Sequence, residues 1–538
     1  MKKVSLIVGI ALLAGTFSAA AETAGRIINA PYFDISKRIL FSQTDYVFGT
    51  SRSMSMGGAF TSLGADLSSM NINPAGLGMY QSSDIGITQG LSIVSARGYS
   101  PYIKQGNFAA GGKNTSYGLD NVGAVFNTYN ASNTLTSFSV GFSYNRAANF
   151  NSRTFFQSAE NSFSIADMFG HQLAVMNNEG GLGPADFQPS AHPWENDNIF
   201  LDEWGAVLGY QTGMINNRGG YYEVNLGAEA LTDSYTRSIT KGGIYDYSLS
   251  MGANIGNKLY VGATLGTSQI EYKETLTYQE NYYNQEQGAG YVNELLYDQM
   301  TDISGTGVNL KLGAIVRPVE ALRVGIAFHL PTYYTINSYY TGEMSTDHSH
   351  SAASGPLADV QRFNTAPRLL VGASVIVAER AVLAVDYERT WYNKIHTRSP
   401  NSMDVENSRE ESAMFFKAGN ALRGGAEFLL NDAVSLRVGG GYQFNVLNDL
   451  GWLANTPIAH QSYNITAGVG FNVGRNGYID IAYMFKHTDY TAFENFYYDE
   501  GVNWAYQYGI PDGSRILPRE YGQCRVNQLI SLTFGSRF

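Results

Sequence analysis

Residues 322–330 read LRVGIAFHL and carry the clearest structural signal in this chain. Every second position from Leu322 to Leu330 is a large apolar residue, and the positions between them hold arginine, glycine, alanine and histidine. Successive side chains of a β-strand point to opposite faces. This stretch therefore predicts a strand with one continuously apolar face and one small or polar face.

The same alternation recurs along most of the chain. It is clean in 434–444, 463–472, 479–486 and 530–538. A soluble β-sandwich would also alternate, but short turns that alternate with long polar and aromatic loops are typical of outer-membrane barrels. The connections here follow that rhythm, so the sequence predicts an all-β fold, a transmembrane antiparallel β-barrel.

About fourteen strands fit between the connections, and an even count is usual for bacterial single-chain barrels. Two interpretations stay open for 148–233: Leu201, Trp204, Leu208 and Gln211 suit a helix face, whereas 219–230 could add a strand pair and raise the count to sixteen. The predicted strands are 84–97, 119–130, 134–147, 234–254, 258–278, 301–317, 321–339, 362–377, 381–395, 412–430, 433–445, 460–473, 477–489 and 524–538. The predicted long loops are 98–118, 148–233, 279–300, 340–361, 396–411, 446–459 and 490–523.

The N-terminus has the features of a secretory signal peptide. Two lysines precede an apolar run from Val4 to Phe17, and small residues follow up to Ala21. The run is shorter than the roughly 20 residues that a spanning helix needs, so we expect cleavage after residue 21 and export. Because Cys524 is the only cysteine, no internal disulfide can form.

Composition narrows the possible partners. The chain has 35 basic and 46 acidic residues, a formal net charge of -11, and no basic run. Nucleic-acid binding needs a concentrated basic surface, so no nucleic-acid partner is expected. The 37 tyrosines and 28 phenylalanines fit the aromatic girdles of a barrel that contacts outer-membrane lipid.

Residues 22–82 lack the alternation and are rich in glycine. A barrel of about fourteen strands encloses a lumen that wall side chains alone cannot fill, so we interpret this segment as a plug inside it. The predicted organisation is a signal peptide (1–21), an N-terminal hatch or plug (22–82) and a transmembrane barrel (83–538).

Three motifs carry a resemblance to the FadL/TodX family of outer-membrane channels. Residues 52–59 (RSMSMGGA), followed by Asp66 and by Asn73-Pro74-Ala75-Gly76-Leu77, look like the hatch of that family. The segments 305–313 (GTGVNLKLG) and 422–428 (LRGGAEF) are similar to its barrel strands. The long insertion 148–233 departs from the family pattern.

The resemblance implies passive uptake of small hydrophobic compounds such as long-chain fatty acids. Outer loops would capture an apolar ligand, an apolar pocket in the barrel would hold it, and a lateral opening would release it when the hatch shifts. The resemblance implies that the hatch is gated by Asn73, Pro74, Ala75 and Gly76.

Two further sets of candidate site residues come from the chain itself. The densest apolar run outside the strands could capture ligand, or it could pack the loop on itself; its members are Phe155, Phe156, Phe163, Met168 and Phe169. Charged residues on polar strand faces predict a lumenal ion-pair network; these are Arg323, Asp386, Glu388, Arg423, Glu427 and Arg437.

No catalytic chemistry is indicated. The chain lacks G-x-S-x-G, H-E-x-x-H, P-loop and Rossmann patterns, so we expect neither an enzyme nor a cofactor. We interpret Asp386 and Glu388 as ion-pair partners rather than paired catalytic acids. His348 and His350 lack further ligands at a recognised spacing, so a solvated loop is favoured over a metal site.

The last strand ends at Phe538, a terminal aromatic that resembles the signal by which the outer-membrane assembly machinery recognises barrels. We therefore expect a multi-pass barrel in the outer membrane of a Gram-negative cell. Two other functions stay open, a diffusion porin for polar solutes and a surface adhesin or structural barrel. The role of residues 22–82 separates them, because a porin needs an open lumen.

Overall fold

The computed structural model describes residues 35–43, 49–99, 108–129, 134–161, 164–178, 180–219, 221–286, 290–348, 350–448, 458–493 and 520–538. The predicted signal peptide and the candidate capture residue Phe163 lie outside these residues. No helix in the described ranges is long and apolar enough to cross a membrane.

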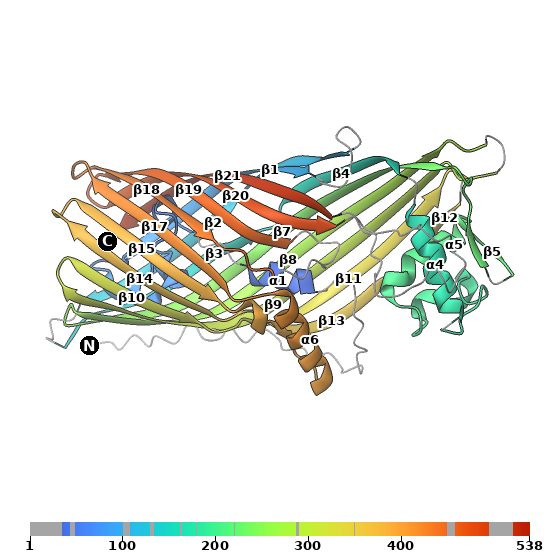
Figure 1. Cartoon of the computed structure of the whole chain (residues 1–538). Helices are drawn as coiled ribbons and strands as arrows, with labels where there is room; N and C mark the ends of the chain where they lie inside the picture. The colour runs from blue at the N-terminus through green and yellow to red at the C-terminus, as the bar shows by residue number, and fades with distance from the viewer. Residues whose placement is uncertain are drawn as a thin grey trace, which may run out of the picture.

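A closed barrel of fourteen antiparallel wall strands forms the body of the molecule (Figure 1). The last strand, β21, pairs with both β20 and β1, which closes the wall and confirms the predicted count. Four wall strands are interrupted and carry two labels each. The strands are β1 (Asp84–Tyr99), β2 (Phe108–Tyr129), β3 with β4 (Leu135–Asn149, Ser152–Asn161), β7 (Leu231–Ile255), β8 (Leu259–Tyr283), β9 (Glu294–Val319), β10 with β11 (Leu322–His329, Tyr333–Thr346), β13 with β14 (Leu357–Asn364, Arg368–Val377), β15 with β16 (Ala381–Thr390, His396–Thr397), β17 (Gly419–Leu429), β18 (Val434–Gln443), β19 (Ile458–Val473), β20 (Gly477–Phe493) and β21 (Glu520–Arg537).

The apolar face of the strands points outward. On β10, Ile326 is 49% exposed whereas Ala327, the next residue, is 1% exposed. Val324 and Phe328 share the outward face with Ile326, and the same pattern repeats around the wall. A sandwich would have buried these residues between two sheets, so the alternation was correctly interpreted as a barrel wall.

Several predicted loops are wrong because the strands run further than expected. β2 begins at Phe108, β8 continues to Tyr283, β9 begins at Glu294 and β11 continues to Thr346, within the predicted loops 98–118, 279–300 and 340–361. Backbone pairing with the neighbouring strand continues there. The outward side chains are no longer regularly apolar, so the hydrophobic alternation that marks a strand disappears before the strand does.

The predicted strand 412–430 also begins too early. Residues Ser402–Phe415 form helix α6, and its N-terminus is capped by Asn401, whose side chain accepts a hydrogen bond from the Met403 N–H. The wall strand β17 begins only at Gly419. In Figure 1, α6 projects from the side of the barrel.

The long insertion 148–233 is mostly folded. It contains β4, helices α4 (Ile165–Asn178) and α5 (Trp204–Gln211), and a separate hairpin of β5 (Ile215–Arg218) and β6 (Tyr221–Val224), gathered at one end of the barrel (Figure 1). The hairpin strands pair only with each other, so the sixteen-strand alternative is wrong. The insertion also contains the 3-10 helices η3 (Pro189–Ala191), η4 (Pro193–Glu195) and η5 (Leu201–Glu203). The shorter elements elsewhere are β12 (Ser351–Ala353) and the 3-10 helix η6 (Tyr392–Lys394).

The described residues of the N-terminal segment (35–43 and 49–82) lie against the inner face of the barrel wall. Its elements are α1 (Ile35–Ser42), α2 (Ser51–Ser55), α3 (Ser69–Ile72) and η2 (Pro74–Met79). Helix α2 contacts β18 to β21, whereas η2 contacts β3, β7, β8 and β9 on another part of the wall. Nearly every residue from 49 to 80 is buried. Residues 49–80 therefore occupy the lumen, because they contact separate parts of a closed wall. They lie in the half of the barrel nearer the short turns, since Gly78 and Pro74 pack against Ala253 and Gly262 beside the turn between β7 and β8.

Candidate ligand cavity and its wall

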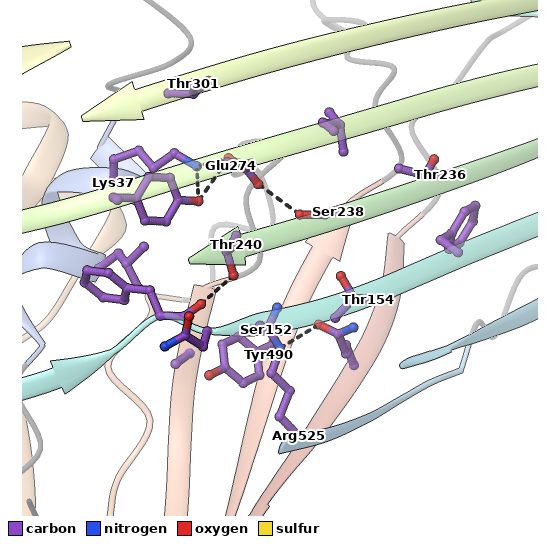
Figure 2. Close-up of a pocket in the computed structure, with 18 of the residues that line it drawn as sticks. Lys37, Ser152, Thr154, Thr236, Ser238, Thr240, Glu274, Thr301, Tyr490 and Arg525 are labelled. Atoms are coloured by element: carbon purple, nitrogen blue, oxygen red, sulfur yellow. Dashed lines mark hydrogen bonds and ion pairs between the residues drawn. The ribbon is translucent and has the colours of Figure 1, made fainter. Parts of the chain in front are cut away.

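A cavity of about 430 Å³ lies in the lumen between α1 and α4. Lys37 and Leu40 of α1 form one end, and Met168 and Phe169 of α4 form the other. The sides come from β4, β7, β8 and β9 and, across the lumen, from β19, β20 and β21 (Figure 2). Its size is in the range of small-molecule sites.

The predicted apolar loop residues meet at this cavity. Phe155, Phe156, Met168 and Phe169 all line it, whereas Phe163 lies outside the described residues. The prediction that the run lies outside the strands is wrong for Phe155 and Phe156, because β4 extends the wall through them. Met168 and Phe169 also belong to a large buried apolar cluster that includes Trp204. The run is therefore both packed and cavity-lining, rather than an exposed patch.

A buried glutamate holds α4 in place. Glu280 on β8 is fully buried and accepts four hydrogen bonds, from the hydroxyls of Ser164, Tyr278 and Tyr282 and from the Ile165 N–H at the start of α4. Burial raises the pKa of the Glu280 carboxyl, against the lowering effect of these donors. Sequence reasoning missed this residue because it falls in a predicted loop; the Tyr-x-Glu-x-Tyr spacing, which puts the three side chains on one strand face, was the available signal.

We expect Glu280→Ala to loosen α4 over the cavity. The change removes the acceptor of four buried hydrogen bonds, at a local cost on the order of 3 kcal/mol. Hydrogen–deuterium exchange of residues 165–178 should speed up markedly. Glu271→Ala, at an exposed glutamate on the same strand, should leave that exchange unchanged; equal exchange in both variants would show that Glu280 does not hold the helix.

Ion pairs fix α1 across the lumen. The Lys37 Nζ lies 2.7 Å from a Glu274 carboxylate oxygen and 3.0 Å from the Tyr272 hydroxyl. Arg38 pairs with Glu411 of α6 at 2.5 Å. A second, smaller cavity of about 60 Å³ includes Phe41 of α1 among its lining residues, so α1 separates two compartments.

The predicted lumenal charges form two clusters. In the first, Glu388 pairs with Arg423 and lies 3.8 Å from Arg368. In the second, Glu427 accepts from Arg437 at 2.5 Å and from Arg52 of α2 at 3.0 Å. Sequence reasoning missed Arg52 and Arg368, because only the closed wall brings them to these carboxylates.

The remaining two predicted charges behave differently. Asp386 accepts a 2.8 Å hydrogen bond from the Thr61 N–H, so it contacts the N-terminal segment rather than an arginine. Arg323 makes no ion pair with any described residue. His348, weighed above as a metal ligand, instead lies 3.1 Å from the Tyr291 carbonyl oxygen.

The predicted gating residues form a compact buried turn. The Asn73 side chain accepts from the Ala75 N–H at 3.1 Å and donates to the Thr61 carbonyl at 2.6 Å. Pro74 occupies the first position of η2, where its fixed φ suits the helix. Gly76 accepts from the Ala65 N–H, so the turn is tied to the rest of the segment.

The wall has a break beside the cavity. Strand β2 pairs with β3 as far as Asn121 opposite Asn145, and pairs with β4 from Gly111 opposite Phe155. No strand ladder joins the described residues between these points. Side chains bridge the interval instead: Arg146 pairs with Asp120, and the Asn149 amide donates to the Ser116 hydroxyl at 3.2 Å.

Comparison with known proteins supports the fold. The toluene transporter TodX of P. putida aligns over 91% of this chain and 99% of its own, with a TM-score of 0.52 and 12% identity. A Pseudomonas aeruginosa FadL homologue aligns over 92% of this chain and 98% of its own, with a TM-score of 0.51 and 9% identity. This chain has the FadL/TodX fold. No protein-family profile and no curated protein sequence matches it.

The FadL/TodX fold explains the glycines in the resembling motifs. A Cβ atom on Gly313 would collide with the Asn73 side chain, and one on Gly425 would collide with Met56. Both glycines face the N-terminal segment from the wall. Their lack of a side chain lets the segment lie directly against β9 and β17.

Proposed function

We propose that this protein is an outer-membrane channel for passive uptake of small hydrophobic compounds in a Gram-negative cell, without catalysis. The observation that carries the proposal is the cavity enclosed between α1 and α4, with apolar residues on both helices. Apolar solutes gain free energy by leaving water, and such sites bind small ligands when a few polar groups fix their orientation.

The outward face supports a membrane location. Large apolar side chains such as Ile326, Val385 and Ile465 are exposed around the wall and suit contact with lipid. The strand that ends at Phe538 closes the wall against β1. We infer that this strand is also the one recognised by the assembly machinery.

In the proposed route, a ligand enters the cavity beneath α4 and leaves sideways through the break between β2 and β3. The N-terminal segment, residues 22–82, would act as the hatch, with Asn73, Pro74, Ala75 and Gly76 setting its position against the wall. Two features support this route: Asn149 and Ser152 at the break line the cavity, and side chains rather than a ladder close the wall there.

A general diffusion porin is less well supported. Such a porin needs a continuous aqueous lumen, but α1 crosses the lumen and the residues from 49 to 80 pack against its wall.

Filling the cavity should test the function directly. Thr236 on β7 lines the cavity, so Thr236→Trp should lower uptake of a hydrophobic probe, such as a fluorescent aromatic hydrocarbon, by about tenfold, because the added ring would occupy the ligand volume. Thr275→Trp places the same ring on an exposed position of β8 and should leave uptake unchanged. Uptake that is equal in wild type, both variants and cells without the protein would refute the proposal.

A further inference from the structure

The cavity has two unlike sides. One side is apolar and comes from the helices and the residues near them: Leu40, Phe150, Ile165, Met168, Phe169 and Tyr297. The other side is a set of hydroxyl groups on three wall strands: Ser152 and Thr154 of β4, Thr236, Ser238 and Thr240 of β7, and Thr301 of β9 (Figure 2). A hydrocarbon without polar groups could not form hydrogen bonds with the second side.

The strand register arranges four of these hydroxyls as a grid. Ser152 lies directly opposite Thr240, and Thr154 lies directly opposite Ser238. Residues two apart on a strand share a face at a spacing of roughly 7 Å, and directly opposed residues of neighbouring strands lie about 5 Å apart. The grid is therefore flat and extends in two directions, which fits several oxygens on one face of a ring system better than the single head group of a flexible chain.

Part of the grid is available for a ligand. Ser238 donates to Glu274, and Thr240 donates to the Phe150 carbonyl. Ser152 is 7% exposed, and its hydroxyl has no hydrogen-bond partner among the described residues. A buried hydroxyl without a partner is unfavourable, so a ligand oxygen at this position would be stabilised.

The charges around the cavity favour a ligand with an anionic group at one end. Glu274 is the only carboxylate among the lining residues that the structure describes, and it is already paired with Lys37. Across the lumen Arg525 of β21 lies over the Tyr490 ring, 4.3 Å from its centroid, and donates to the Gln523 side chain. Arg525 lines the cavity on this side, where none of the described lining residues carries a carboxylate (Figure 2).

We propose that the cavity takes facially amphipathic acids: rigid, apolar ring systems with hydroxyl groups along one face and an acidic group at one end. The hydroxyl grid would form hydrogen bonds with the polar face of the ligand, and the α4 and α1 residues would cover its apolar face. Arg525 would form an ion pair with its acidic group. The inference rests on the proposed function and specifies its ligand class.

The test compares two steroid acids that differ only in their hydroxyl groups. Cholate carries hydroxyls on one face, and 5β-cholanate carries none. Binding of each, below its micelle concentration, is measured on the full-length barrel in lipid nanodiscs, with empty nanodiscs correcting for partition into lipid. The variants are Ser152→Ala with Thr154→Val for the grid, Arg525→Gln for the acid, and Thr275→Val as an exposed control.

We expect wild type to bind cholate at least about tenfold more tightly than cholanate, the ratio that one or two good hydrogen bonds supply. The grid variant should lose that ratio while binding cholanate as before, and Arg525→Gln should weaken both acids equally. A wild-type ratio near one, or an equal loss of both acids in the grid variant, would overturn the inference. The inferred ligand class can fail while cholanate still binds and the hydrocarbon probe is still taken up, and the proposed function then stands. If no apolar compound binds an intact barrel, the proposed function itself fails.

Discussion

Uptake of a hydrophobic probe should stop when Ser116 and Asn149 are covalently joined. These residues face each other across the break between β2 and β3, where the Asn149 amide donates to the Ser116 hydroxyl at 3.2 Å. In a Ser116→Cys, Asn149→Cys double variant, with Cys524 replaced by serine, oxidation or a short thiol cross-linker would close the interval. If the ligand leaves sideways there, uptake should fall to the level of cells without the protein and return after the bridge is cleaved.

The control is a cross-link where the wall is already continuous. Asn127 and Ser139 are direct partners in the ladder between β2 and β3, and their side chains are hydrogen-bonded at 2.8 Å. An Asn127→Cys, Ser139→Cys bridge adds a covalent bond without closing any opening, so it should leave uptake unchanged. Full uptake through a barrel cross-linked at 116 and 149 would exclude the break as the exit.

Removing residues 22–82 should convert the protein into an open pore. In the described structure, residues 49–80 pack against the wall and meet it at buried charges: Thr61 donates to Asp386, and Arg52 of α2 pairs with Glu427. Without them, water and polar solutes would occupy a lumen that wall side chains cannot fill. Flux of a polar sugar into liposomes should rise by about tenfold or more, approaching that of an open porin.

Assembly of the shortened barrel is checked by the shift between folded and heat-denatured forms on a gel. Lys37→Met serves as a matched variant, because it removes the contacts of the Lys37 ammonium with Glu274 and Tyr272 without shortening the segment. Its leakage should stay far below that of the deletion. Identical polar flux with and without residues 22–82, from barrels that assemble equally, would contradict the role of the segment as a hatch.

Much of the wall was predictable from local pattern. The alternation in 322–330 identifies a strand, and it also identifies which side chains face outward, because side-chain direction on a strand has a strict period of two. Fourteen segments of this kind, joined alternately by short turns and long loops, are typical of a closed barrel. The same argument failed at the strand ends and within 148–233, where the outward side chains are no longer regularly apolar. It also failed at residues 412–415, which end helix α6 instead of beginning a strand.

The cavity was not predictable in this way. Phe156 and Phe169 were recognisable as an apolar run, but nothing near them in the chain indicates that they face Lys37 or Arg525. The hydroxyl grid exists only because β4 and β7 pair in one register, which places Ser152 opposite Thr240 across nearly ninety residues of chain.

Local pattern therefore specifies the wall of this protein, its strand order and its outward face, because those depend on neighbours in sequence. The position of α1, the break between β2 and β3 and the contents of the cavity depend on which strands lie side by side and on how the closed wall meets the N-terminal segment. These are contacts between distant residues, and only the folded barrel brings them together.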